Sequence, residues 1–232
     1  MAGTKRRAAK SQALKPPQSK RRAKVSGQTT SKKTAKSKMA AGNELQKWFS
    51  ENQENADGRA VVLPEGFERL CEALEFDMDG VEPMVLLWRL NGVELGTVEL
   101  EGWEKGLSEM GVRDMHGLKR AVENTVIEFK SNPELFKAFY RKMFDYLRQD
   151  KQKSVTAEYA MAVLPVITSN MWVFERFAEF LKANEDTIKT ISRDQWQSLL
   201  ALARNLQPDM SNYSKDDAWP TMFDDFVDWA TS

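Results

Sequence analysis

Large apolar side chains recur every three or four residues along this chain from about Asn43 onward. This spacing places them on one side of an α-helix, whereas a half-buried strand would alternate apolar and polar residues. We therefore predict an all-α body of roughly nine or ten helices. The longest apolar stripe consists of Phe136, Phe139, Tyr140, Met143, Phe144 and Leu147.

Residues that favour helix ends place several other helices. Pro64 suits the first turn of one helix, and Gly111 suits the end of another. Ser192 and Gln195 have the spacing of a capping box, which predicts a helix that includes Trp196. Further stripes are formed by Met84, Leu87 and Trp88, by Leu100, Trp103 and Leu107, and by Phe174, Phe177, Phe180 and Leu181.

Two short β-prone segments, residues 60–63 and 96–99, interrupt the helical pattern. Each comes just before a helix, and together they would form the kind of small ribbon that joins paired EF-hand loops. Residues 77–80 (sequence DMDG) look like the start of a calcium loop. Counting from residue 77, however, Glu82 stands where glycine is needed and Trp88 where a bidentate glutamate is needed. We therefore expect no calcium site.

The charges of the chain are segregated. Residues 1–40 hold 13 Lys and Arg and no acidic residue, whereas the whole chain has 34 basic and 34 acidic side chains. The remaining residues therefore carry 21 basic and 34 acidic side chains. This asymmetry indicates two different kinds of partner.

The basic segment, residues 1–42, contains almost no large apolar side chain, so we predict a disordered tail. Its clusters at residues 5–7 and 20–24 favour recognition by a nuclear import receptor, and we expect a nuclear protein, with the cytoplasm left open. Loose binding to nucleic-acid phosphates and a merely solubilising role are the alternatives. No aromatic residue is interleaved with the basic ones, so base stacking is not expected.

Residues able to support catalysis are scarce. Cys71 and His116 are the only cysteine and histidine, which excludes a disulfide framework and a Cys/His zinc site. Cys71 shares an apolar stripe with Phe67 and Leu74, where a thiol is inert, although a thioester-forming nucleophile is the alternative. His116 is predicted to lie at the surface between helices. No apolar run approaches the ~20 residues that span a bilayer. We expect a soluble intracellular binding protein without metal or cofactor.

The C-terminal segment carries a resemblance to a known family. Residues 209–213 (DMSNY), 218–220 (AWP) and 224–227 (DDFV) resemble the signature of the defective-in-cullin-neddylation family. Residues 71–74 (CEAL) and 194–196 (DQW) agree with it in order and spacing. The similarity extends over roughly residues 58–230, and it identifies the body, which we place at 43–232, as a PONY domain.

The resemblance implies a fold of two EF-hand-like helical halves that bind no calcium. It also implies a non-catalytic scaffold of a ubiquitin-like protein ligase, which promotes cullin neddylation. Such a scaffold binds the C-terminal winged-helix region of a cullin together with the N-acetylated neddylation conjugating enzyme. The alternative is a nuclear, nucleic-acid-associated adaptor that acts through the basic tail.

The same resemblance implies two sets of site residues. The cullin would be bound by Asp194, Ala218, Asp224 and Asp225, because carboxylates make strong bonds to Lys and Arg and a small alanine permits close approach. These acids would alternatively just stabilise the first turns of their helices. The conjugating enzyme would enter a pocket formed by residues that are otherwise ordinary core: Phe67, Leu86, Leu87, Val98, Tyr146, Val163 and Val166.

Three residues near this pocket depart from the family pattern. Pro83 replaces an aliphatic residue, and Tyr146 stands where phenylalanine is commoner. Pro165 is expected to kink or end the helix that starts near Ala157. The shape of the pocket, and hence the choice of conjugating enzyme, depends on these differences.

Overall fold

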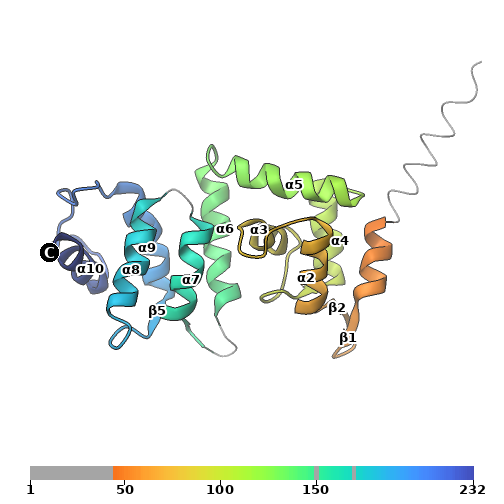
Figure 1. Cartoon of the computed structure of the whole chain (residues 1–232), viewed down its shortest axis with the longest axis horizontal. Coiled ribbons are helices and arrows are strands. Elements are labelled where there is room, and N and C mark those ends of the chain that lie inside the picture. Colours follow the sequence, from red (N-terminus) through yellow and green to blue (C-terminus); the bar gives the residue numbers. More distant parts are fainter. Residues whose placement is uncertain (1–43, 149–151, 169–170) are drawn as a thin grey trace, which may run out of the picture. The chain divides into compact units, whose positions relative to one another are not determined.

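The computed structural model describes residues 44–148, 152–168 and 171–232. The predicted tail, residues 1–42, lies outside the described residues. The described chain is mostly helical, as predicted, and it also contains two small antiparallel sheets (Figure 1). None of its described helices is both long and apolar enough to cross a membrane.

The first half begins with a helix over residues 44–52. The elements that follow it are β1 (Glu54–Ala56), β2 (Arg59–Val62), α2 (Pro64–Ala73), α3 (Glu82–Arg89), β3 (Val98–Glu99) and α4 (Leu100–Met110). The predicted boundaries at Pro64 and Gly111 are confirmed. Pro64 occupies the first turn of α2, and Gly111 follows α4 in the left-handed conformation with φ 66°.

The predicted ribbon between residues 60–63 and 96–99 is confirmed, with the first strand shifted by one residue and the second shortened to two residues. β2 and β3 are antiparallel, and Val62 lies opposite Val98. β1 extends this sheet and was not predicted. It is joined to β2 by Asp57 and Gly58, which both have positive φ, as a tight hairpin requires.

The second half consists of α5 (Met115–Glu128), α6 (Pro133–Leu147), β4 (Ser154–Thr156), α7 (Ala157–Ile167), α8 (Trp172–Ala183), β5 (Thr190–Ser192), α9 (Arg193–Asn205) and α10 (Thr221–Thr231). β4 and β5 form a second antiparallel ribbon, which the sequence did not predict. Each of these strands ends at a helix cap. The Thr156 side chain caps α7, and Ser192 forms the predicted capping box with Gln195 at the start of α9.

The prediction that His116 lies between helices is wrong. His116 is in the first turn of α5, although it is exposed as expected. The carboxylate of Asp114 caps this helix by accepting a hydrogen bond from the Gly117 amide at 2.7 Å. Pro165 lies near the end of α7, which stops two residues later at Ile167, in agreement with the expected helix end. Pro83 is accommodated in the first turn of α3, where its missing amide hydrogen is not required.

The long apolar stripe of α6 lies at the centre of the core. α6 contacts α3 in the first half and α7 and α9 in the second. Tyr140 of α6 and Trp196 of α9 are joined by two reciprocal hydrogen bonds. The Tyr140 hydroxyl donates to the Trp196 carbonyl at 2.8 Å, and the Trp196 indole donates to the Tyr140 carbonyl at 3.0 Å. This buried pair fixes α9, and with it the residues at its exposed start, against α6.

Candidate functional site

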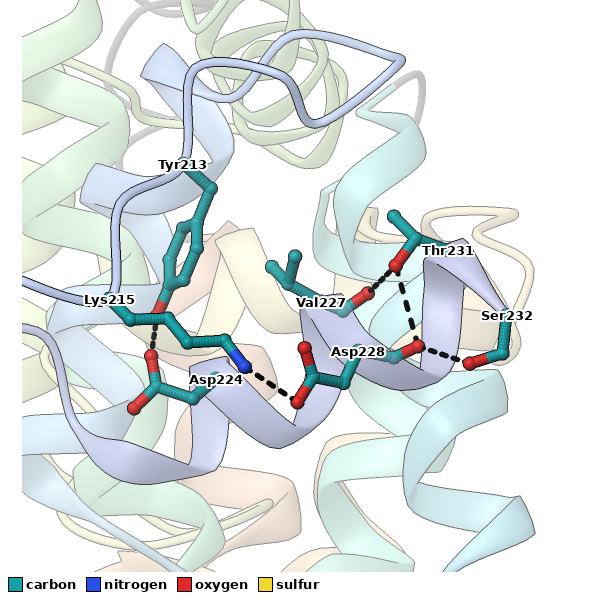
Figure 2. A network of polar contacts seen from close by, with 7 residues as sticks. All are labelled: Tyr213, Lys215, Asp224, Val227, Asp228, Thr231 and Ser232. Carbon is teal, nitrogen blue, oxygen red and sulfur yellow. Dashed lines mark hydrogen bonds and ion pairs between the residues drawn. The ribbon is translucent and has the colours of Figure 1, made fainter.

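The predicted acidic surface is built on α10 and on the loop that precedes it. Asp224 is half-buried in the first turn of α10, and Asp225 beside it is exposed. The hydroxyl of Tyr213 donates a hydrogen bond to Oδ1 of Asp224 at 2.7 Å. Lys215 Nζ reaches the next turn of the helix and contacts Asp228 Oδ2, also at 2.7 Å (Figure 2). Two side chains of the loop therefore hold two carboxylates of α10.

The DMSNY segment of the loop has a structural explanation residue by residue. The Asp209 carboxylate accepts hydrogen bonds from the amide and the hydroxyl of Ser211, which together lower the pKa of Asp209. Met210 is buried and has a φ of 56°. The Asn212 amide group donates to the Asn205 carbonyl at 2.8 Å, which ties the loop to the end of α9. With Tyr213 bonded to α10, the segment connects α9 to α10.

Ala218 lies next to two residues that start α10. It is exposed, whereas Trp219 is partly buried and packs edge-on against Phe223, with ring centroids 6.3 Å apart. Pro220 is the N-terminal cap residue of the helix. The bulky neighbours are therefore used for packing, and the methyl group of Ala218 is left at the surface.

Asp194 belongs to a different helix from the other three predicted residues. It is exposed in the first turn of α9, two residues before the buried Trp196. α8 contacts both α9 and α10, which places the two helices at the same part of the fold (Figure 1). The structure thus groups Ala218, Asp224 and Asp225 on one loop–helix unit, with Asp194 presented from α9.

The residues predicted for the conjugating-enzyme pocket divide between two cavities and the core. Phe67 and Leu87 line a cavity of about 330 Å³, together with Pro83. Tyr146 lines a second cavity of about 390 Å³. Three of the other predicted residues are buried in the core, namely Leu86, Val98 and Val163. The fourth, Val166, is half-buried.

Exposed apolar residues around these cavities were missed in the sequence. Leu95 lines both cavities and is 50% exposed. Met78 lines the first and Val93 the second, and both are also exposed. They lie outside the helical stripes, in the connections before α3 and β3, so periodicity gave no signal for them. They extend the apolar lining outward to the surface.

Tyr146 brings a polar group into this apolar region. Its hydroxyl is buried and has no hydrogen-bond partner among the described residues. Burial, and then the nearby charge of Asp145, raise the pKa of Tyr146 far above its usual range. The hydroxyl therefore stays protonated, and it is a free hydrogen-bond donor at a position where phenylalanine would offer none.

Cys71 cannot act as a nucleophile in this fold. Its side chain is fully buried in α2, and burial, followed by the charge of Glu68, raises its pKa to about 12. The thiolate that a thioester mechanism needs is thus suppressed, and the alternative of a thioester-forming enzyme is rejected.

The segment 77–80 forms a turn rather than an open loop. The Asp77 side chain accepts a hydrogen bond from the Asp79 amide at 3.1 Å, and the Gly80 amide donates to the Asp77 carbonyl at 2.9 Å. These bonds explain Asp77 as a residue that forms the turn. Within the described ranges, no three His, Cys, Asp or Glu side chains are grouped as metal ligands would be.

Comparisons with known proteins show which sequences this chain resembles. Residues 117–229 match the family model described as Cullin binding. DCN1-like protein 4 of Homo sapiens is 32% identical over 183 residues, which cover 78% of this chain and 61% of the relative. For the Danio rerio protein of the same name the identity is also 32%, with 63% of the relative covered. The chain therefore spans less than two thirds of the length of these two relatives.

A third relative is covered more completely. DCN1-like protein 5 of Mus musculus is 30% identical over 189 residues, which cover 78% of this chain and 75% of the relative. The family resemblance of the sequence is thus confirmed over most of the described helices. By this similarity, the chain belongs to the DCN1-like family.

Proposed function

We propose that this protein is a non-catalytic scaffold that promotes the neddylation of cullins. It would bind the C-terminal winged-helix region of a cullin and the N-acetylated neddylation conjugating enzyme at the same time. The observation that carries the proposal is the loop–α10 unit, in which Ala218, Asp224 and Asp225 lie within the region that matches the Cullin binding family. The burial of Cys71 supports a role without covalent chemistry.

The cullin-binding surface is proposed to recognise basic side chains. The Tyr213 hydroxyl occupies Oδ1 of Asp224 and leaves the second carboxylate oxygen for a partner. Asp225 and Asp194 are exposed and add negative charge. A Lys or Arg of the cullin would make charge-assisted hydrogen bonds to these groups. The acidic excess outside the tail would speed the encounter with a basic surface.

The conjugating enzyme is proposed to insert its N-terminus into the cavity lined by Phe67 and Leu87. N-acetylation removes the terminal positive charge, so an apolar cavity accepts the N-terminus without burying an ammonium group. Leu86, Val98 and Val163 would support the cavity from the core. The exposed Leu95 would contact the partner at the rim of both cavities.

The helix order supports an interpretation of the fold as two EF-hand-like halves. In the first half, the helix at 44–52 and α2 flank β2, α3 and α4 flank β3, and the two strands pair. In the second, α6 and α7 flank β4, α8 and α9 flank β5, and these strands also pair. Paired helix–loop–helix units joined by a two-stranded ribbon are the arrangement expected of EF-hand pairs without their ions.

The mechanism that follows is positional. Holding a cullin and a charged conjugating enzyme on one scaffold makes their encounter effectively intramolecular. A restricted relative orientation brings the acceptor lysine of the cullin to the thioester of the conjugating enzyme. The reactive cysteine belongs to the conjugating enzyme, and this chain supplies two binding surfaces.

Reconstituted cullin neddylation, with and without the full chain, tests the proposal. Asp224→Ala and Ala218→Arg should reduce both cullin binding and stimulation, whereas Glu109→Ala, an exposed acid on α4, should leave them unchanged. Wild-type protein that neither binds cullin nor accelerates modifier transfer would refute the scaffold function.

Leu95→Asp tests the second surface without disturbing the core, because Leu95 is 50% exposed. The variant should lose stimulation with the acetylated conjugating enzyme while retaining cullin binding. Ile127→Asp, at an apolar residue of α5 that is 65% exposed, is the matched control and should behave as wild type. Equal stimulation by both variants would place the conjugating enzyme elsewhere.

The basic tail is proposed to act as a nuclear import signal, because residues 1–40 concentrate 13 Lys and Arg. Replacing Lys20, Arg21 and Arg22 by alanine should move a fluorescent fusion of the full chain from the nucleus to the cytoplasm. The nucleic-acid adaptor is the competing function. It predicts salt-sensitive retention of the chain on DNA or RNA that disappears when residues 1–40 are deleted.

A further inference from the structure

We infer that Lys215 is an internal counter-ion of the acidic surface on α10, and that a basic side chain of the cullin displaces it on binding. The inference rests on the proposed function, since it concerns how the same surface receives its partner. Lys215 would then compete with the cullin for the same carboxylates, and its charge would affect the affinity for the cullin.

The contacts of Lys215 place its charge on the face that carries the carboxylates. Lys215 Nζ lies 2.7 Å from Asp228 Oδ2, and Asp228 follows Asp224 by one helical turn (Figure 2). The Lys215 backbone belongs to the loop, only two residues after Tyr213, which bonds to Asp224. The ammonium group therefore lies one helical turn from Asp224, one of the acids proposed to bind the cullin.

Lys215 interacts electrostatically with three acids of α10, namely Asp224, Asp225 and Asp228. Its hydrogen bond to Asp228 is the main cause that raises its pKa, and the charges of Asp228, Asp224 and Asp225 raise it further. Arg176, another cation close to α10, is directed elsewhere: its guanidinium stacks on Trp229 at 4.5 Å and bonds to Glu179 at 2.7 Å. Lys215 thus offsets part of the negative charge on the side of Asp224 and Asp228.

The Tyr213–Asp224 and Lys215–Asp228 contacts differ in how easily an incoming side chain can replace the loop residue. The Tyr213–Asp224 bond is partly buried and joins a neutral donor to a carboxylate. In the Lys215–Asp228 pair both side chains are more than half exposed, at 55% and 61%. Exposed ion pairs contribute little to stability, so an incoming Lys or Arg can replace Lys215 at small cost. The tyrosine then keeps the loop in place while the lysine moves away.

The inference predicts that neutralising Lys215 strengthens cullin binding. Lys215→Gln removes the competing cation and makes the surface more negative by one charge. We expect the affinity for the cullin C-terminal region to rise about two- to fivefold at low salt, as removal of one exposed charge contact would give. The gain should come mainly from faster association. It should shrink as added salt shortens the screening length.

The experiment compares full-length wild type, Lys215→Gln, Lys215→Arg and Lys105→Gln in a salt series of binding measurements with the cullin C-terminal region. Lys105 is an exposed lysine of α4 paired with Glu109 at 3.9 Å, so Lys105→Gln makes the same change in net charge away from the surface. The inference requires tighter binding of Lys215→Gln alone, with Lys215→Arg equal to wild type.

The outcomes separate this inference from the proposed function. If wild type binds cullin but Lys215→Gln binds no tighter than Lys105→Gln, Lys215 is no competitor and the scaffold function stands. If both glutamine variants gain equally, only net charge matters and the inference is overturned. If wild type fails to bind at any salt concentration, the proposed function and the inference are rejected together.

Discussion

At the scale of single residues, Tyr213 shows how the loop before α10 is held against the helix. Its ring lies in the loop, and its hydroxyl donates to Asp224 across the gap to α10 (Figure 2). Burial, and then this hydrogen bond to Asp224, raise the pKa of Tyr213 far above its usual range, so the donor proton is retained. The loop that carries Ala218 is therefore fixed by a bond that does not change near neutral pH.

Tyr213→Phe keeps the ring and removes only this bond. We expect the free energy of unfolding to fall by about 0.5–1 kcal/mol, the usual net contribution of one partly exposed hydrogen bond. Amide hydrogen exchange should accelerate in residues 208–220 and stay unchanged in α6. Denaturant titration and exchange mass spectrometry measure the two effects. Unchanged exchange in the loop would show that the bond is not what orders it.

Cys71 gives a prediction for alkaline pH. A thiol in the unfolded chain loses its proton near pH 9, whereas the folded pKa is about 12. Because the folded value is raised, the contribution of Cys71 to stability is complete below pH 9 and is lost between pH 9 and 12, at no more than about 1.4 kcal/mol per pH unit. Cys71→Ser still buries a group of similar size but does not titrate there. Its unfolding free energy should decline less steeply with pH than that of wild type, as measured by urea titration at each pH.

At the scale of secondary-structure elements, the junction of α6 and α9 determines where Asp194 is presented. Tyr140→Phe removes the hydroxyl that donates to the Trp196 carbonyl, which also lies within the hydrogen-bonded ladder of α9. We expect a loss of about 0.5–1.5 kcal/mol in unfolding free energy, the net contribution of one intramolecular hydrogen bond. Arg141→Gln, at an exposed position of the same helix, is a suitable comparison and should cost less. Equal losses for both variants would contradict this special role of the pair.

The helices could largely be predicted because their apolar residues follow a local period. α2, α6 and α9 have buried stripes of closely spaced large residues, and their starts carry proline or a capping box. α5 was missed because its buried residues are fewer, namely Leu118, Val122 and Thr125. β4 and β5 escaped prediction because strands of three residues form through pairing with a distant segment, which no local pattern records.

The predicted cullin-binding residues stay a prediction. Their acids were chosen from a family signature, whereas the bonds from Tyr213 to Asp224 and from Lys215 to Asp228 are seen only in the folded loop and α10. The pocket residues were placed by aligning the helices with the family, and that alignment included buried Leu86 and Val98 but not the exposed Leu95, which lies outside the helices. Exposure depends on tertiary packing, which residue type alone does not reveal.

At the scale of the whole molecule, the segregation of charge should govern association with a cullin. Residues after the tail carry 34 acidic and 21 basic side chains, whereas residues 1–40 carry 13 basic ones. Deleting residues 1–40 removes positive charge, so association with a basic partner should be faster at low salt and nearly unchanged at high salt. Stopped-flow mixing with the cullin C-terminal region measures this. Slower association after the deletion would mean that the tail itself contacts the cullin.

The chain has one cysteine, Cys71 of α2, and its side chain is buried. A second cysteine introduced on the outside, for instance at the exposed Ala201 of α9, would be the sole sulfhydryl that a maleimide dye reaches in the native protein. A fluorescent reporter can therefore be attached at one chosen spot without first removing the native residue. Binding of the proposed cullin partner could then be followed through a single dye on α9.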